Sequence, residues 1–432
     1  MAQSTIAAIS TALGEGGIAI IRTSGPDAVV ISTKILTRKN FDTPGKLYLT
    51  SLLDSEGNVI DKVLAVNFRA PNSYTGEEIV EIHTHGGILI AQLCLKLLIS
   101  NGALLAEPGE FTRRAFINGK IDLSQAEGVL GIIKSRSVEA LKASARTLTG
   151  ELSSKVHELH DEILNLQAGV EIDLDFPEGD SFDVNFDSLS KIINDLEELI
   201  ARCEAGMLLN HGVRVVIAGK PNAGKSSLLN ALLGRNRAIV TEIPGTTRDI
   251  ISENLIINGL PVNLSDTAGL RDTDNIIEAQ GVKLALDAMN DSDICLYVID
   301  GAEEFHEALP DVANVIVVIN KSDLEQRAKI NTPFRKINVS AKNNIGIDKI
   351  KAAIYEQATR NSSLVEGLNV SSGQLESLRE TLNSLTDAIN SPDDDITAGL
   401  LNSARVSLLN VLGIDAGDEL LNNMFSRFCV GK

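Results

Sequence analysis

A glycine-rich loop follows a short β-branched run within residues 213–227. The loop reads Gly-Lys-Pro-Asn-Ala-Gly-Lys-Ser, which fits G-x-x-x-x-G-K-[ST] in the strand–loop–helix context of a phosphate-binding loop. Gly219 and Gly224 let backbone N–H groups surround phosphate oxygens, and the following helix adds the positive end of its dipole. We expect Lys225 to reach the β- and γ-phosphates and Ser226 to ligate Mg²⁺. Because such a pattern also occurs by chance, the assignment of a phosphate-binding loop needs support from other segments of the chain.

Two later stretches fit the parts of a GTPase that sense the γ-phosphate. Pro-Gly-Thr-Thr-Arg-Asp occupies residues 244–249, and a threonine there completes Mg²⁺ coordination only when a γ-phosphate is present. Asp-Thr-Ala-Gly follows an apolar run at residues 266–269. Asp266 is expected to hold Mg²⁺ through water, and the Gly269 N–H to contact the γ-phosphate.

Two more stretches predict recognition of guanine. Asn320-Lys-Ser-Asp323 ends a β-branched run, and the Asp323 carboxylate can accept the N1–H and N2–H₂ groups that adenine lacks. Ser340-Ala341-Lys342 supplies a backbone N–H for the guanine O6. All four stretches lie at the carboxyl ends of expected strands, where open α/β sheets bind ligands. Together they predict a GTP site.

The residue after Asp-Thr-Ala-Gly is Leu270, where Ras-like enzymes carry the glutamine that orients the attacking water. Water positioning must therefore come from elsewhere. Glu278, in the following segment, could orient a water, but the residues alone favour a solvated helix carboxylate.

The elements that must position these residues divide the chain into parts. Residues 1–118 mix strand-like and helix-like runs and predict an α+β domain, residues 119–210 are helical, and residues 211–362 alternate strands and helices, which predicts a parallel sheet. Residues 363–432 are helical again. We therefore expect a multidomain α/β and α protein in which a P-loop domain is inserted into a discontinuous helical domain, since insertion at a surface loop is physically inexpensive.

Composition limits the alternatives. The 432 residues include 44% hydrophobic and 22% charged residues, typical of a globular protein, and no apolar run reaches the roughly 18 residues of a membrane span. The start of the chain lacks the basic region of a signal peptide, so we expect a cytoplasmic protein without a membrane. A net charge of −19 argues against broad nucleic-acid binding but leaves room for a local basic patch.

Stretches along the whole chain resemble the MnmE (TrmE) family of tRNA modification GTPases. Outside the P-loop part these are Pro-Asn-Ser-Tyr-Thr-Gly-Glu-Glu at residues 71–78, Pro-Gly-Glu-Phe-Thr-Arg-Arg at residues 108–114 and the C-terminal Phe-Cys-Val-Gly-Lys at residues 428–432. The last of these is similar to the family's F-C-I-G-K ending, with one conservative change. The resemblance implies a folate-binding, dimerising N-terminal domain, a discontinuous helical domain and an inserted Ras-like P-loop G domain.

The family further implies potassium-dependent GTP hydrolysis, activated when the G domains of a homodimer meet. Its members act with the FAD-dependent protein MnmG (GidA), in a heterotetramer or larger complex, on the wobble uridine (position 34) of certain tRNAs. A 5-formyl- or 5,10-methylene-tetrahydrofolate supplies the one-carbon unit, and C5 receives a carboxymethylaminomethyl or aminomethyl group. Cofactors implied are therefore GTP, Mg²⁺, K⁺ and a tetrahydrofolate derivative.

The resemblance also implies roles for individual residues. The K⁺ ligands would be the Asn222 side chain and oxygens of Thr241, Ile243 and Thr246; the Mg²⁺ ligands would be Ser226 and Thr247. Glu278 matches the family's water-positioning carboxylate. The resemblance therefore favours a catalytic role for Glu278 over a solvated helix carboxylate. The expected GTP contacts are Asn222, Ala223, Gly224, Lys225, Ser226, Ser227, Thr241, Glu242, Ile243, Pro244, Gly245, Thr246, Thr247, Asp266, Thr267, Ala268, Gly269, Asn320, Lys321, Asp323, Ser340, Ala341 and Lys342.

The expected folate contacts are Arg22, Glu81, Lys120 and Lys432. Judged only as residues, these are charged groups that would more often form surface salt bridges. Cys429 lies in the tail, which the resemblance directs at the folate site, while a frayed helix end is the simpler reading of the residues. We favour the tail directed at the folate site, where the Cys429 thiol could take part in chemistry, and a catalytic role for the thiol stays open.

Two alternative functions remain at this point. One is a regulatory GTPase of the ribosome-assembly type, which needs a basic RNA-binding domain that neither the acidic composition nor the helical flanks suggest. The other is a folate-dependent one-carbon transferase for which GTP is only a regulator.

Overall fold

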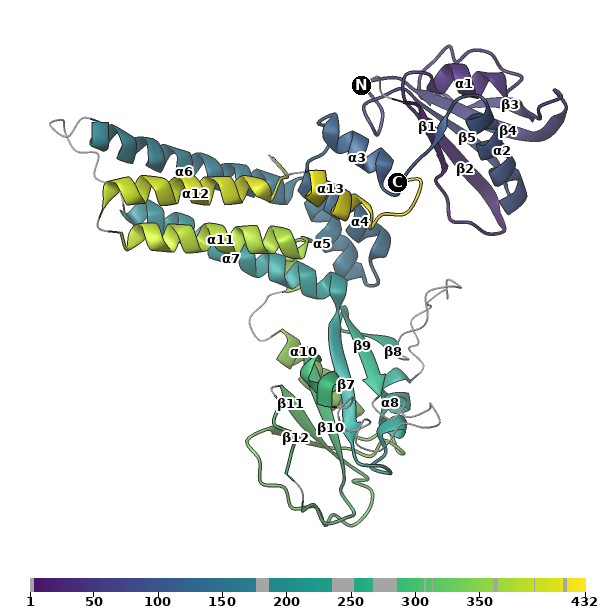
Figure 1. The fold of residues 1–432 in the computed structure, drawn as a ribbon. Helices are drawn as coiled ribbons and strands as arrows, with labels where there is room; N and C mark the ends of the chain where they lie inside the picture. The colour runs from purple at the N-terminus through teal and green to yellow at the C-terminus, as the bar shows by residue number, and fades with distance from the viewer. Residues whose placement is uncertain are drawn as a thin grey trace. The chain divides into compact units, whose positions relative to one another are not determined.

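The computed structural model describes residues 4–175, 186–234, 252–266, 286–306, 308–312, 314–359, 364–391, 393–414 and 418–432 (Figure 1). The chain divides into two compact units. The first contains Met1–Ala126 and Leu408–Lys432, and the second contains Glu127–Ser407.

The first unit is built on a six-stranded sheet with the order β3-β4-β5-β2-β1-β6. Its strands are β1 (Ile6–Ile9), β2 (Gly16–Ser24), β3 (Tyr48–Leu53), β4 (Val59–Phe68), β5 (Ile79–Gly86) and β6 (Leu104–Leu105). In β2, Ile21 packs in the core with helices α1 (Ala28–Lys34) and α2 (Ile88–Ser100), while Arg22 points to the opposite face. The strand's alternation therefore places a charged side chain on the face away from these helices.

The end of the chain packs into this same unit. Helix α13 (Asp418–Phe425) contacts α3 (Glu110–Ile117), and the rings of Phe425 and Phe116 lie 6.3 Å apart. Gly413 has a φ of +77°, and an added Cβ would lie 2.8 Å from the side chain of Leu123. The backbone near Gly413 therefore packs directly against the helix that begins at Leu123. Segments from the two ends of the sequence thus share one core.

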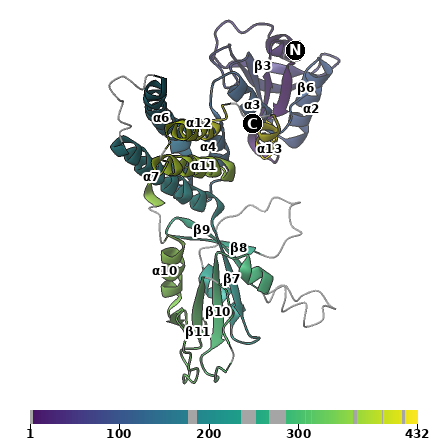
Figure 2. The same ribbon diagram turned by 60° about the vertical axis from the view of Figure 1, so that its left-hand side comes forward.

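Long helices fill the N- and C-terminal parts of the second unit. They are α4 (Leu123–Lys134), which begins in the first unit, α5 (Val138–Leu148), α6 (Glu151–Asp175), α7 (Phe186–His211), α11 (Ser372–Ile389) and α12 (Asp394–Asn410), with a short η2 (Leu364–Glu366). α11 packs on α7, and α12 lies beside α6 in both views (Figure 1 and Figure 2). Asn369 joins the two sequence pieces, because its Nδ2 donates to Glu127 O and its backbone oxygen accepts from Thr147, both at 3.0 Å.

Between these helical pieces lies a second six-stranded sheet with the order β12-β11-β10-β7-β9-β8. Its elements are β7 (Val213–Gly219), α8 (Lys225–Leu233), β8 (Ser252–Ile257), β9 (Leu260–Asp266), β10 (Ile294–Asp300), β11 (Val315–Asn320), β12 (Arg335–Asn338) and α10 (Ile347–Ala358). All pairings are parallel except β8 with β9. The central strands are almost continuous apolar runs because both of their faces are buried, and Arg214 near the start of β7 is the exposed exception.

The predicted architecture of an α+β domain, a discontinuous helical domain and an inserted P-loop domain is confirmed. The individual boundaries at residues 118, 210 and 362 stay predictions; the compact units divide the chain at Ala126 and Leu408 instead. None of the described helices is long and apolar enough to span a lipid bilayer.

Candidate functional site

The glycine-rich loop joins β7 to α8 through backbone conformations that few residues adopt. Gly219 and Gly224 have φ values of +136° and +93°, and Asn222 lies at +67°. A Cβ on Gly219 would lie 2.2 Å from Val298 O, so only glycine fits at that position. Lys225 is buried, and its Nζ donates a hydrogen bond to Gly219 O at 2.9 Å. This bond joins the two ends of the loop.

Asn320 connects this loop to the two segments predicted to recognise guanine. Its Nδ2 donates to Ala223 O at 2.9 Å, and its Oδ1 accepts from the Ala341 N–H at 3.0 Å. The side chain is 3% exposed. A Cβ on Gly224 would lie 2.2 Å from Asn320 Nδ2, so the close approach also requires glycine. One amide therefore brings together the ends of β7, β11 and β12.

The Asp323 carboxylate lies at the same edge of the sheet. A hydrogen bond from the Ser340 side chain holds the pKa of Asp323 below its usual range, so the carboxylate is ionised at neutral pH. The neighbouring Lys321, at a φ of +61°, forms an ion pair with Asp300 at the end of β10. An exposed carboxylate supported by a buried hydroxyl is a suitable acceptor for two adjacent N–H donors.

Ser226 and Ser227 lie exposed in the first turn of α8, and Lys342 is exposed beyond Ser340. Asp266 ends β9 in register with Ile217 of β7, so its backbone is at the same edge as the loop. The remaining predicted nucleotide, metal and catalytic residues lie outside the described residues: Thr241, Glu242, Ile243, Pro244, Gly245, Thr246, Thr247, Thr267, Ala268, Gly269 and Glu278, as does Leu270.

A second cluster lies in the first unit, around two of the predicted folate contacts. Arg22 of β2 and Glu81 of β5 are in register, and Arg22 Nε lies 2.8 Å from Glu81 Oε1. The guanidinium carbon lies 5.7 Å from the centre of the Tyr74 ring and 5.6 Å from that of Phe111. The Nε2 of His83 lies 3.4 Å from the other Glu81 oxygen. Phe111 is fully buried and Tyr74 half-buried, so these rings support the Arg22 guanidinium, and the partly exposed Arg22–Glu81 pair could hydrogen-bond a polar heterocycle.

The C-terminal tail reaches the same neighbourhood. The Phe111 N–H donates to Lys432 O at 3.2 Å, and Val430 forms a β-bridge with Pro108. Gly431 has a φ of +94°, and an added Cβ would lie 2.3 Å from Ile9 O. Phe111, whose ring lies near Arg22, therefore also holds Lys432, the last residue of the chain. The Cys429 side chain is exposed.

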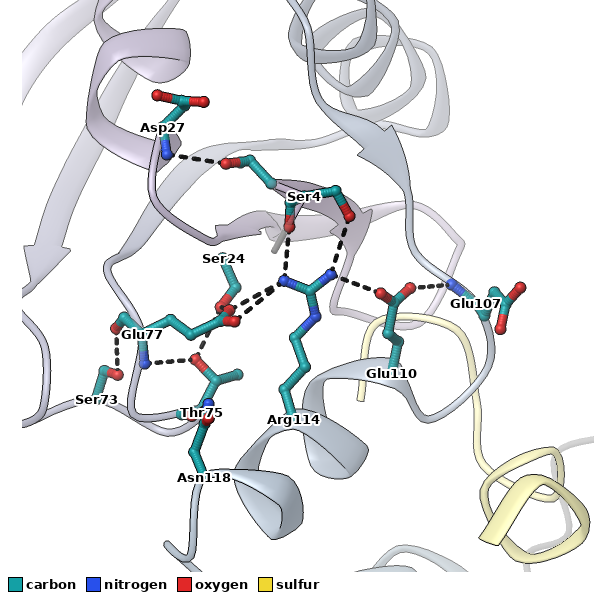
Figure 3. A network of polar contacts seen from close by, with 11 residues as sticks. Ser4, Ser24, Asp27, Ser73, Thr75, Glu77, Glu107, Glu110, Arg114 and Asn118 are labelled. Atoms are coloured by element: carbon teal, nitrogen blue, oxygen red, sulfur yellow. Dashed lines mark hydrogen bonds and ion pairs between the residues drawn. The ribbon is translucent and has the colours of Figure 1, made fainter. Parts of the chain in front are cut away.

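A buried ion network supports the segment that holds the tail (Figure 3). Arg114 of α3 donates to Glu77 at 3.1 Å, to Glu110 at 2.7 Å and to Ser4 O at 2.7 Å. Ser24 donates to the same Glu77 carboxylate at 2.6 Å. Arg114 and Glu77 are each 8% exposed, so each charge depends on its partners for stabilisation.

Lys120, the fourth predicted folate contact, is tied to the loop that carries Tyr74. Its Nζ donates to Pro71 O at 3.1 Å, and its stem lies 3.3 Å from where a Cβ of Gly76 would stand. Sequence reasoning missed Tyr74 and Phe111 as neighbours of Arg22. Both lie in stretches that carry the family resemblance, and this resemblance was the sequence signal that could have pointed to them.

Two family models match the chain. The N-terminus of the GTP-binding protein TrmE matches residues 5–120, and the MnmE helical domain matches residues 123–429. The tRNA modification GTPase MnmE of Carboxydothermus hydrogenoformans is 41% identical over 100% of both chains, and that of Thermoanaerobacter pseudethanolicus is 40% identical over 100% of both.

Among solved structures, the G domain of the T. maritima FeoB iron transporter aligns at 24% identity over 34% of this chain and 98% of its own, with a TM-score of 0.24, too low for structural comparison. The two family models and the full-length relatives agree with the resemblance seen in the sequence. On this basis the chain belongs to the MnmE (TrmE) family of tRNA modification GTPases.

Proposed function

We propose that this protein is a potassium-activated GTPase that works with the FAD-dependent protein MnmG on the wobble uridine of certain tRNAs. The observation that supports this most is the double hydrogen bond of Asn320, which joins the phosphate-binding loop to the guanine-recognition segments at one edge of the sheet. Membership of the MnmE family supplies the tRNA context. The product would carry a carboxymethylaminomethyl or aminomethyl group at C5.

The described residues can bind GTP as follows. Asp323 accepts the N1–H and N2–H₂ of guanine, and the Ala341 segment, fixed by Asn320, offers a backbone N–H to O6. Lys225, which closes the glycine loop, exchanges its carbonyl partner for the β- and γ-phosphates. The N-terminus of α8 adds its dipole.

The residues also fit two cations. The Ser226 hydroxyl, exposed in the first turn of α8, would hold Mg²⁺ with Thr247. The exposed Asn222 side chain would offer an amide oxygen to K⁺, with Thr241, Ile243 and Thr246 as further ligands. When bound, these cations neutralise the charge that develops between the phosphates. Asn222 is conformationally suited to this position, since asparagine tolerates positive φ.

Glu278 would orient the attacking water in place of the glutamine that Leu270 replaces. Activation would follow when the G domains of a homodimer meet and complete each site. In this proposal, K⁺ takes the role that an arginine finger has in other GTPases.

In the first unit, Arg22 and Glu81 would bind the pterin-like ring of a 5-formyl- or 5,10-methylene-tetrahydrofolate, while Tyr74 and the buried Phe111 hold the Arg22 guanidinium in place. Lys432 and Lys120 would add charge from the tail and from the adjacent loop. Cys429 is exposed on the docked tail, where a thiol is available to a ligand of this site. The proposal includes a cytoplasmic location, with tRNA and MnmG as partners.

The decisive experiment compares GTP hydrolysis in K⁺ and Na⁺ at equal ionic strength. We expect hydrolysis at least roughly tenfold faster in K⁺, because losing a charge-stabilising group costs about 10²–10³ in rate. Asn222→Ala should remove the difference between the cations while keeping GDP binding, and Glu278→Ala should slow hydrolysis in both. Equal rates in K⁺ and Na⁺ would refute the cation assignment.

A further inference from the structure

Basic residues are concentrated in one segment of this acidic protein. Residues 327–351 contain seven of the chain's 39 Lys and Arg residues but only one of its 58 Asp and Glu residues. A random distribution would place more acidic than basic residues there. The segment covers β12, at the edge of the second sheet, and the start of α10. It does not contain the phosphate-binding loop.

Three of these cations surround a groove of about 590 Å³. Arg335 and Lys336 of β12 line one side, Lys349 of α10 lines another, and Ile330 and Asn338 contribute an apolar and a polar surface. Lys329, exposed, lies next to Ile330 in the sequence. The groove therefore has a positively charged rim over a partly apolar floor.

Most of the charge is available to a ligand. Glu356 pairs with Arg335, and Glu325 pairs with Arg327. Among the described residues, Lys329, Lys336 and Lys349 form no ion pair, although Lys336 Nζ donates to Ile330 O at 3.2 Å. The outer edge of β12 also pairs with no other described strand, so its peptide groups are open to hydrogen bonding. This combination fits a ligand with many negative oxygens.

We propose that this groove, formed by β12, α10 and residues 328–330, binds the phosphate backbone of the tRNA. The inference rests on the proposed action on tRNA. Elsewhere the chain carries an excess of acidic residues, which repel phosphates, so this is a surface where contact lowers the electrostatic free energy. Lysines on a groove neutralise phosphates without reading bases, so the contact positions the RNA and does not select its sequence.

The test uses the full-length protein and a fluorescein-labelled tRNA, with binding measured at several KCl concentrations. The groove variant is Lys329→Gln/Lys336→Gln/Lys349→Gln. Its matched control is Lys62→Gln/Lys96→Gln/Lys142→Gln, which removes the same charge from three exposed lysines elsewhere. We expect the control to bind tRNA like the wild type. The groove variant should bind roughly tenfold or more weakly at about 0.1 M salt, with a salt slope smaller by about 1 per lysine.

Single substitutions at Lys349 give a second measurement. Lys349→Glu should weaken tRNA binding more than Lys349→Gln, because reversal adds repulsion. Equal binding by the groove variant and its control, or no binding by the wild type, would overturn the proposal. Labelled poly-glutamate serves as a second probe, for an acidic protein segment. If the groove variant lost poly-glutamate binding but kept tRNA binding, the proposal would also be overturned, since the groove would then belong to an acidic protein segment. GTP hydrolysis in K⁺, measured on the same preparations, tests the proposed function separately.

Discussion

Single residues at the sheet edge decide which base the nucleotide site accepts. Asp323 is predicted to accept two guanine N–H groups, and hydrogen bonds between a charged and a neutral group contribute about 1.5–3 kcal/mol. Asp323→Asn should therefore weaken GTP binding by roughly 10- to 100-fold and should favour xanthosine triphosphate, whose C2 oxygen can accept from the new amide. Nucleotide titrations would measure both affinities.

Glu325→Gln is a suitable control, because Glu325 is exposed and its ion pair is with the exposed Arg327. The Ser340 hydrogen bond lowers the pKa of Asp323 from its usual 3.8, so its contribution should be constant above that value and should decline only as the pH falls through the lowered pKa. Unchanged GTP affinity in Asp323→Asn would remove Asp323 from the base site.

Gly431 is the residue on which we expect the docked position of the C-terminal tail to depend. Its φ of +94° and the 2.3 Å separation of an added Cβ from Ile9 O mean that Gly431→Ala should displace the last residues. Carboxypeptidase should then remove Lys432 roughly tenfold or more faster, since the tail opens more often. Gly119→Ala is the matched control, because Gly119 has a φ of +66° but nothing within 4 Å of the added Cβ. Equal rates for both variants would show that the tail does not depend on this close contact.

At the scale of elements, the buried network between α3 and the segment before β5, which contains Glu77, connects pieces that are remote in sequence. Arg114→Met leaves the Glu77 carboxylate buried without its cation, which should destabilise the first unit by about 3–5 kcal/mol. Adding Glu77→Gln should restore part of this stability, because no uncompensated charge remains. Hydrogen exchange over residues 4–126 measures the change.

An exposed ion pair in the same unit provides the comparison. Asp42→Asn breaks the pair with Arg38, in which the Asp42 side chain is 62% exposed, and should cost less than about 1 kcal/mol. If Arg114→Met and Asp42→Asn had similar effects, the network would not contribute to the stability of the unit.

These elements also show what the sequence could and could not predict. The nucleotide segments were predictable because each one is local: the glycines, Asn320-Lys-Ser-Asp323 and Ser340-Ala-Lys each follow one strand. The β-branched run before the glycine-rich loop, which the sequence predicts as a strand, is β7. The Arg114–Ser4 contact spans 110 positions, and no local pattern specifies such a pairing. Likewise, Tyr74 and Phe111 meet at Arg22 only because three separate elements fold together.

At the scale of the whole molecule, the four cysteines differ sharply in their surroundings. Cys94 in α2, Cys203 in α7 and Cys295 in β10 are buried, and burial raises the pKa of each thiol to about 12. Cys429 is exposed on the docked tail. Since the thiolate is the reactive form, the three buried thiols are protected by both access and ionisation at neutral pH.

We therefore expect a maleimide to label one thiol per native chain at pH 7 and four in denaturant, counted by mass spectrometry. Raising the pH to 9 should not add a second native label, because the raised pKa values keep the buried thiols protonated until the pH approaches 12. Cys429→Ser should abolish native labelling. A second label at pH 7 would mean that one of the cores opens, and its position would show whether the N-terminal unit, the helices or the G domain does so.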